Sequence, residues 1–369
     1  MRVARVLFVT MLVTAPALAQ MPASREALDG VDPVALLTQG KEISGKPEFK
    51  VSHGKFDYLF ANAENKAIFE KTPGKYEVQL NGACARMGGG VTGNASDYAV
   101  VDGKIYIFGS DDCHKKFVAA PAKYLPRAAP PMPTAAADLQ KGRAMIDRAV
   151  AAIGGAERLD AIASYVETSS QVQKRAAGDV TVATKTIRRF PSDVRVERTM
   201  TMGDRTQQSA TLVTKEGAWF IGQGRAYPQN AEGRATSEQE YGRHLVSILR
   251  ARRDAGFKVA ALPPATVDGA TVDRVRVQHR GVDVTLNLDP ASARVSSVSF
   301  TARNMDGEIG DYTLLLSDVR EVSGLRLPFA ERALFNGAPD GFLTRDLTSI
   351  AINQPLDAAL FQPPPPGEK

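Results

Sequence analysis

Apolar and polar residues alternate along much of the chain beyond residue 160. In 282–288 the even-numbered positions hold Val, Val, Leu and Leu, and the odd-numbered ones hold Asp, Thr and Asn. A shorter alternation marks 194–197, and apolar residues share one face of 312–316. Because successive side chains of a strand point to opposite faces, each such strand has one apolar and one polar face. With the turn residues between them, the spacing predicts roughly ten or eleven strands in a mainly antiparallel sheet.

Three helical patterns accompany these strands. The first, 139–153, places its apolar residues on one face and ends at a Gly-Gly pair. A short helix is expected at 156–162, and another at 238–252 with the apolar stripe Tyr241, Leu245, Ile248 and Leu249. A long sheet with one apolar face must curl or be covered by helices. We therefore expect a curved, open β half-barrel with covering helices.

The first third of the chain contains an internal repeat. A Gly-Lys pair and five residues after it each recur once with nearly constant spacing. The paired positions are Gly54 and Gly103, Lys55 and Lys104, Phe60 and Phe108, Phe69 and Phe117, Pro73 and Pro121, Lys75 and Lys123, and Tyr76 and Tyr124. Such self-similarity indicates duplicated units, here about 28–78 and 80–127.

Each unit has the pattern of a strand, a turn, a second strand and a short helix. The helices are expected at 64–71 and 111–119, with Asn62 and Ser110 as N-caps. The fold class is therefore α+β: tandem small α+β modules followed by the mainly antiparallel half-barrel.

Composition divides the chain further. A basic start, a short apolar run and Ala17-Leu18-Ala19 form the pattern of a signal peptide cleaved after Ala19. The predicted divisions are the signal peptide 1–19, the tandem domain 24–127, a Pro/Ala linker 128–137, the half-barrel domain 138–362 and a Pro-rich tail 363–369. Because no other long apolar run occurs, we expect a periplasmic or secreted protein with no transmembrane segment in the mature chain.

Charge and motifs add little chemistry. The formal net charge of +5 is spread over interspersed basic and acidic residues, and no basic run with interleaved aromatics occurs, which argues against nucleic-acid binding. Gly88, Gly90 and Gly93 match G-x-G-x-x-G but follow no predicted strand, so we interpret them as a flexible loop. With no other catalytic motif, we expect a protein that is not an enzyme. Three histidines are expected to be solvated or hydrogen-bonded: His53, His244 and His279.

The first region resembles the YHS domain family of small modules. The resemblance rests on Leu28-Asp29-Gly30-Val31-Asp32-Pro33-Val34, on 60–66 and 69–76, on Asn81-Gly82-Ala83-Cys84-Ala85, and on 101–106 and 108–124. Metal-binding members resemble D-P-V-C followed by F-C-S-x-x-C. The first copy here has Ala or Asn at each cysteine position, whereas the second retains Cys84 and Cys113, with Gly109 at the middle position. The resemblance implies that any metal chemistry belongs to the second copy.

Three interpretations of Cys84 and Cys113 stay open at this point. The family motif brings the two positions together, and an oxidising compartment favours a disulfide between them. A thiolate metal site completed by His114 or Met87 would suit copper or zinc. The third interpretation is that both are free, buried and inert.

The second region is similar to the LolA/LolB-like superfamily of periplasmic lipoprotein carriers. The pattern is carried by Gly154-Gly155 with Leu159 and Ile162, by Gly217-Ala218-Trp219, by 286–290 and 324–328, and by Ile352-Asn353 and Leu360-Phe361. It implies an open half-barrel with an apolar cavity for a lipid or other hydrophobic ligand. Trp219 and Phe220 are candidates for the cavity lining or for the core. The alternative function is an envelope accessory protein that binds partner proteins, with a structural Cys84–Cys113 disulfide and no metal.

Overall fold

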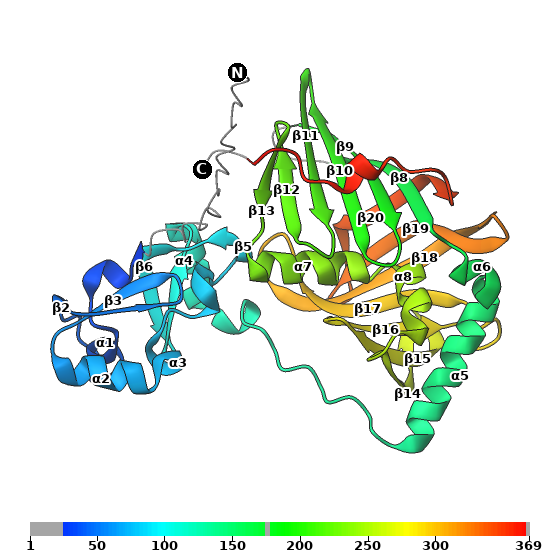
Figure 1. Ribbon diagram of the computed structural model, residues 1–369. Helices are drawn as coiled ribbons and strands as arrows, with labels where there is room; N and C mark the ends of the chain where they lie inside the picture. Colours follow the sequence, from blue (N-terminus) through cyan, green and yellow to red (C-terminus); the bar gives the residue numbers. More distant parts are fainter. Residues whose placement is uncertain (1–24, 174–177, 367–369) are drawn as a thin grey trace, which may run out of the picture.

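The computed structural model describes residues 25–173 and 178–366, so the predicted signal peptide lies outside the described residues. Figure 1 shows an N-terminal part beside a larger part built on one sheet, connected by an extended segment. No helix within the described ranges is both long and apolar enough to cross a membrane.

The N-terminal part contains two series of elements that share a 3-10 turn, a β-hairpin and a helix after the hairpin. Between the turn and the hairpin, the first series has a helix and the second has two short strands. The first series is β1 (Arg25–Glu26), η1 (Leu28–Gly30), α1 (Pro33–Gln39), β2 (Lys46–His53), β3 (Phe56–Phe60), α2 (Ala63–Lys71) and α3 (Pro73–Tyr76). The second series is η2 (Leu80–Gly82), β4 (Ala83–Cys84), β5 (Gly88–Thr92), β6 (Asn94–Val101), β7 (Lys104–Phe108), α4 (Asp111–Ala119) and η3 (Pro121–Lys123). Asn62 caps α2 and Ser110 caps α4 through their side chains, which confirms both N-cap predictions.

The turns η1 and η2 share an unusual backbone conformation. Leu28 and Asp29 have φ values of 56° and 50°, and Leu80 and Asn81 have values of 53° and 51°. A glycine with positive φ follows in both cases, Gly30 and Gly82. By this match, Asp32 of the first series corresponds to Cys84 of the second.

The larger part consists of one 13-stranded sheet and a few helices. The strands are β8 (Ser164–Gln173), β9 (Val180–Arg189), β10 (Asp193–Met202), β11 (Arg205–Val213), β12 (Ala218–Gly222), β13 (Arg225–Pro228), β14 (Lys258–Val267), β15 (Ala270–His279), β16 (Val282–Leu288), β17 (Val295–Arg303), β18 (Ile309–Val322), β19 (Leu325–Phe335) and β20 (Ala338–Ile352). The helices are α5 (Ala136–Ile153), α6 (Ala156–Asp160), α7 (Ala231–Gly242), α8 (Leu245–Arg250), η4 (Ala251–Arg253) and η5 (Ala358–Phe361).

Neighbouring strands of this sheet are antiparallel, and their order is β13-β12-β11-β10-β9-β8-β20-β19-β18-β17-β16-β15-β14. The mainly antiparallel sheet is thus confirmed, with thirteen strands rather than ten or eleven. The edge strands β13 and β14 are not paired with each other, so the sheet is open.

The sheet curls around its helices. Helix α7 contacts β11 and β12 near one edge of the sheet and β16 near the other. One helix can touch strands this far apart in the strand order only if the sheet bends around it. Figure 1 shows α7 and α8 lying across the strands, and α5 lying along β14 and β15. The largest apolar core fills the space between the sheet and α5, α6 and α8.

The predicted helix 238–252 is wrong in one respect, because the structure breaks it into α7, α8 and η4. The apolar stripe continues across the break, which is why the pattern predicts one helix. His244 has the extended backbone conformation of an N-cap, with φ −62° and ψ 129°. Its ring is buried beside Glu167, so tertiary contacts override the helical pattern here.

Replacement of Gly142 by alanine is expected to destabilise the protein by about 1–3 kcal/mol, even though alanine favours helix. Gly142 is buried in the middle of α5, and a Cβ atom there would lie 2.8 Å from the backbone of Ala260 in β14. The matched change Gly233→Ala in α7 meets nothing closer than 3.4 Å and is expected to be neutral or stabilising by up to about 1 kcal/mol. Urea unfolding of both variants measures the difference; equal effects would contradict the tight α5–β14 packing.

Candidate functional site

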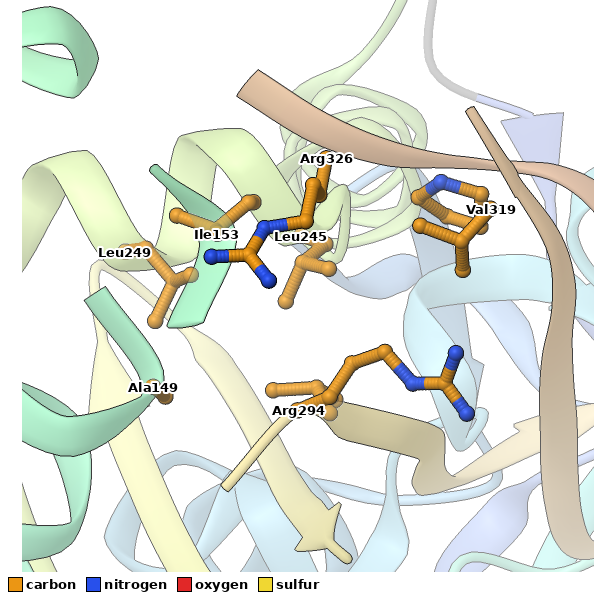
Figure 2. Close-up of a pocket in the computed structure, with 9 residues that line it drawn as sticks. Ala149, Ile153, Leu245, Leu249, Arg294, Val319 and Arg326 are labelled. Atoms are coloured by element: carbon orange, nitrogen blue, oxygen red, sulfur yellow. The ribbon is translucent and has the colours of Figure 1, made fainter. Parts of the chain in front are cut away.

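An apolar pocket lies between the helices and one end of the sheet. Its cavity volume is about 20 Å³, which has room for about one water molecule. Its lining comes from α5, α8, the start of β17 and the facing ends of β18 and β19: Ala149, Ile153, Leu245, Leu249, Arg294, Val295, Val319, Arg326 and Pro328. Figure 2 shows the guanidinium group of Arg326 among Ile153, Leu245 and Leu249, and the side chain of Arg294 on the opposite side of the open space. The pocket is therefore apolar with two positively charged groups.

The two aromatic residues predicted to line a cavity lie elsewhere. Trp219 is partly buried and packs against the core on the other side of the sheet, where Phe361 of η5 also packs. Phe220 is 46% exposed and lies near the ring of Tyr227 on β13. Neither residue lines the pocket described above. Trp219 and Phe220 are adjacent on β12, so their side chains point to opposite faces of the sheet. The side chain of Trp219 points to the face that packs against Phe361.

A buried charged network lies under the junction of α7 and α8. Glu167 on β8 is 2% exposed. Its Oε1 accepts a hydrogen bond from Nη1 of Arg345 at 2.9 Å, and its Oε2 lies 3.5 Å from Nε2 of His244. Arg345 also donates from Nε to Glu331 at 2.7 Å. The network joins β8, β19 and β20 to the start of α8.

The shifts in pKa follow from this burial and pairing. Burial opposes ionisation of Glu167, but the charge of Arg345 and the hydrogen bond with His244 outweigh it and hold the pKa well below its usual range. Burial and the charge of Arg188 lower the pKa of His244, so its imidazole is neutral near neutral pH. The carboxylate is therefore charged and the histidine is not.

Arg188 connects this network to α7. Its Nη1 donates to the backbone carbonyl of Tyr241 at 2.8 Å. Within the described residues, Nε of Arg188, Nε of Arg243 and Nδ1 of His244 are buried without a hydrogen-bond partner. The prediction that His244 is solvated or hydrogen-bonded therefore holds only for Nε2. The pattern of apolar residues could not reveal this network, because charged residues occupy inward-facing positions of otherwise apolar strands.

The structure brings Cys84 and Cys113 together in the second series of the N-terminal part. Both are buried, in one cluster with Phe108 and Phe117, and both are free thiols in the structure. Burial raises the pKa of the Cys113 thiol, but hydrogen bonds with Ser110, Arg86 and Cys84 outweigh it and lower the pKa. Nη1 of Arg86 lies 3.8 Å from Sγ of Cys113.

The first series has a polar pair at the corresponding positions. Nδ2 of Asn65 donates to Oδ2 of Asp32 at 2.7 Å. The carboxylate of Asp32 is fully buried and also accepts hydrogen bonds from the backbone N–H groups of Val34, Ala35 and Ala61. A hydrogen-bonded carboxylate–amide pair in one series is thus replaced by a thiol pair in the other. The sequence repeat alone matches Asn65 with Cys113. The match of Asp32 with Cys84 comes from the shared backbone conformation of the turns η1 and η2.

The other two predicted metal ligands differ in their surroundings. His114 Nδ1 lies 2.5 Å from Oδ1 of Asp97, and its ring stacks on Phe108. Met87 is partly buried against the cluster that holds both cysteines. Within the described residues, no group of three or more His, Cys, Asp or Glu side chains is placed to bind a metal ion. The metal site of Cys84, Cys113, His114 and Met87 stays a prediction.

The loop after Cys84 contacts the larger part. Nη1 of Arg303, at the end of β17, donates to the backbone carbonyl of Arg86 at 2.5 Å. A Cβ atom on Gly88 would lie 2.8 Å from Nε of Arg303, and one on Gly89 would lie 2.7 Å from the carboxylate carbon of Glu232 in α7. The interpretation of Gly88, Gly90 and Gly93 as a flexible loop is wrong for Gly88 and Gly90, which lie in β5, while Gly93 lies between β5 and β6. Gly88 and Gly89 allow the close approach of Arg303 and Glu232.

Comparison with known proteins gives limited information. No family model matches the chain. No curated protein matches it either. Among solved structures, it is similar to a domain named for outer membrane lipoprotein sorting from Vibrio parahaemolyticus, with 12% identity and a TM-score of 0.39, covering 61% of this chain and 97% of that one.

Two further solved structures have a similar degree of likeness. A DUF1329 family protein from Desulfovibrio piger has 12% identity and a TM-score of 0.39, covering 61% of this chain and 98% of that one. A LolA superfamily protein from Nitrosomonas europaea has 13% identity and a TM-score of 0.36, covering 58% and 97%. The fold described above rests on the strand order and contacts of this chain alone.

Proposed function

We propose that this protein is a non-enzymatic binding protein of the bacterial envelope that holds a hydrophobic ligand, such as a lipid acyl chain. The ligand lies between the concave face of the sheet and the helices α5 and α8. The observation that carries the proposal is the apolar pocket between Ile153, Leu249 and Val319. The sequence resemblance to LolA/LolB-like carriers supports the same function.

The size of the pocket requires a movable cover. Small-molecule pockets usually measure about 300–1,000 Å³, whereas the volume of this cavity, about 20 Å³, has room for about one water molecule. A long acyl chain needs more room, and α8 is the wall that can give way. It has six residues and is separated from α7 by the break at His244.

Polar contacts hold this cover in place. Arg188 donates to the end of α7, Nη1 of Arg250 donates to the backbone carbonyl of Ile162, and Arg252 forms an ion pair with Asp160 at 2.7 Å. Val246, Ile248 and Leu249 of α8 also belong to the largest core, so movement of α8 uncovers apolar surface that the ligand then covers. The proposal therefore assigns α7 and α8 to a cover that shifts when the ligand enters.

The two arginines of the pocket favour a ligand with an anionic end. The guanidinium group of Arg294 interacts electrostatically with Asp289, and among the described residues Arg326 forms no ion pair with a carboxylate. A guanidinium group pairs well with a carboxylate or a phosphate. An acyl chain in the pocket with its anionic group at these arginines satisfies both the apolar wall and the charges.

Titration of the full chain with a fluorescent fatty-acid probe tests this function. We expect saturable binding of one probe per chain, displaced by an unlabelled fatty acid more readily than by the alcohol or the alkylammonium of equal length. Equal displacement of the probe by all three competitors would contradict only the preference for an anionic end group, not the hydrophobic-ligand function. Absence of any saturable binding would contradict the hydrophobic-ligand function itself.

A further inference from the structure

We propose that Cys84 and Cys113 form a redox-active dithiol, in which a hydroperoxide oxidises Cys113 and Cys84 then closes a disulfide. This goes beyond the proposed ligand binding and concerns a different part of the molecule. It starts from the disagreement between the metal-binding pattern and the residues present. Where a metal site would gather further ligands, the described structure places a guanidinium group beside the sulfur.

A positive charge next to a thiol disfavours a metal cation and favours a thiolate. Arg86 is 9% exposed, and its Nη1 lies 3.8 Å from Sγ of Cys113 and 3.1 Å from a carboxylate oxygen of Asp112. Its buried Nε has no hydrogen-bond partner among the described residues. A second guanidinium group, of Arg303, interacts electrostatically with Cys84. The buried guanidinium group of Arg86 and the partly buried one of Arg303 therefore both act on the thiol pair.

The helix α4 adds to this environment. Cys113 lies in its first turn, and the backbone N–H of Cys113 donates to Oγ of the N-cap Ser110 at 3.3 Å. The N-terminal end of a helix carries a partial positive charge that stabilises an anion such as a thiolate. Cysteines that react with oxidants are typically placed in such electropositive surroundings. The guanidinium and the helix end act on the same sulfur.

Exposure separates the roles of the two thiols. Cys113 is 7% exposed, whereas Cys84 is 0% exposed. Cys113 is therefore the more accessible of the two residues to a small oxidant such as hydrogen peroxide. Cys84 packs in the same buried cluster as Cys113 and interacts with its thiol, so it is the group placed to react with an oxidised Cys113.

The proposed chemistry takes place in two steps. The Cys113 thiolate attacks one oxygen of the peroxide, the O–O bond breaks, and hydroxide leaves and becomes water, so that the sulfur is oxidised to sulfenic acid. The Cys84 sulfur then attacks the Cys113 sulfur, the S–O bond breaks, and water leaves with the proton of the Cys84 thiol. In total, two thiols and one peroxide give one disulfide and two waters.

Peroxide treatment of the reduced full-length chain tests the proposal. Mass spectrometry of the wild-type protein is expected to show loss of two hydrogens and a Cys84–Cys113 linkage that a thiol reductant reverses. The variant Cys84→Ser should accumulate sulfenic acid at Cys113, trapped with dimedone, whereas Cys113→Ser should leave Cys84 unmodified. The variant Arg86→Met should be oxidised about tenfold more slowly, and the charge-retaining control Arg86→Lys much less so.

Three results would overturn this inference. The first is that peroxide leaves both thiols of the wild-type protein unchanged. The second is that sulfenic acid forms faster at Cys84 than at Cys113. The third is that the purified protein contains stoichiometric copper or zinc. If Arg86→Met fails to fold, as judged by circular dichroism, two other measurements still decide the proposal. They are the disulfide linkage in the peroxide-treated wild type and the residue at which sulfenic acid forms. None of these outcomes depends on ligand binding by the sheet, so the proposed function is tested separately.

Discussion

The variant Glu167→Gln is expected to lose about 3–5 kcal/mol of its free energy of unfolding, one of the largest effects of any single change in this protein. Glutamine has the size of glutamate but no charge. It would leave Arg345 with one carboxylate partner instead of two, and Arg188 without a nearby negative charge. Removing one partner of a buried ion pair is costly because the remaining charge stays buried without a counter-charge.

A surface ion pair provides the control for this prediction. Glu238 pairs with Arg234 at 2.7 Å on α7, and both side chains are partly exposed. The change Glu238→Gln is expected to cost less than about 1 kcal/mol, since exposed pairs contribute little. Urea unfolding of both variants measures the two losses. Equal losses would show that the network at Glu167 does not stabilise the junction of α7 and α8.

The free energy of unfolding lost in Glu167→Gln should also depend on pH. The pKa of Glu167 lies well below its ordinary value of 4.5 in the folded chain, so its contribution is fully present above that value and declines as the pH falls below it. The pKa of His244 is lowered from 6.5, so protonation of the unfolded chain already reduces stability below that pH. The difference between wild type and Glu167→Gln should therefore be largest near neutral pH and shrink in acid.

The variant Ala149→Phe is expected to weaken binding of a fatty acid at least tenfold. Ala149 is 2% exposed on α5 and lines the apolar pocket, so a phenyl ring there occupies the space that the acyl chain would take. Overpacking costs about 1–3 kcal/mol in a tight core, and the small cavity beside Ala149 places this variant at the upper end of that range. Titration with the fluorescent probe and urea unfolding measure the two effects separately.

A matched variant on the same helix separates pocket filling from helix effects. Ala144 is exposed on α5 and does not line the pocket, so Ala144→Phe should bind the probe like the wild type. Val319→Phe fills the pocket from β18 and should reproduce the effect of Ala149→Phe even if that variant is unstable. Normal binding by both pocket variants would place the ligand elsewhere.

Much of the fold could be predicted from the alternation of apolar and polar residues, for a physical reason. Strands such as β16 have one face against the core and one toward solvent, so their sequence shows the alternation directly. β11 was harder to find, because its first half, 205–208, is polar and exposed on both faces. The break at His244 left no signal, since the apolar stripe of α7 and α8 keeps helical spacing across it.

The candidate sites also divide into features that the sequence indicates and features that only the structure shows. The thiol pair was found from sequence because a repeat shows where one copy departs from the other. The pocket residues Leu249 and Val319 were missed, since apolar residues that line a cavity look like any other core residues. Glu167 and Arg345 were missed because only the three-dimensional structure shows that they meet, 178 residues apart in the chain.

The most direct test of the central proposal is native mass spectrometry of the full chain after incubation with a fatty acid and removal of the excess. We predict a species heavier than the polypeptide by the mass of one fatty acid, strongly reduced in Ala149→Phe and retained in Ala144→Phe. Only the bare polypeptide mass, for the wild type as for both variants, would contradict the hydrophobic-ligand function.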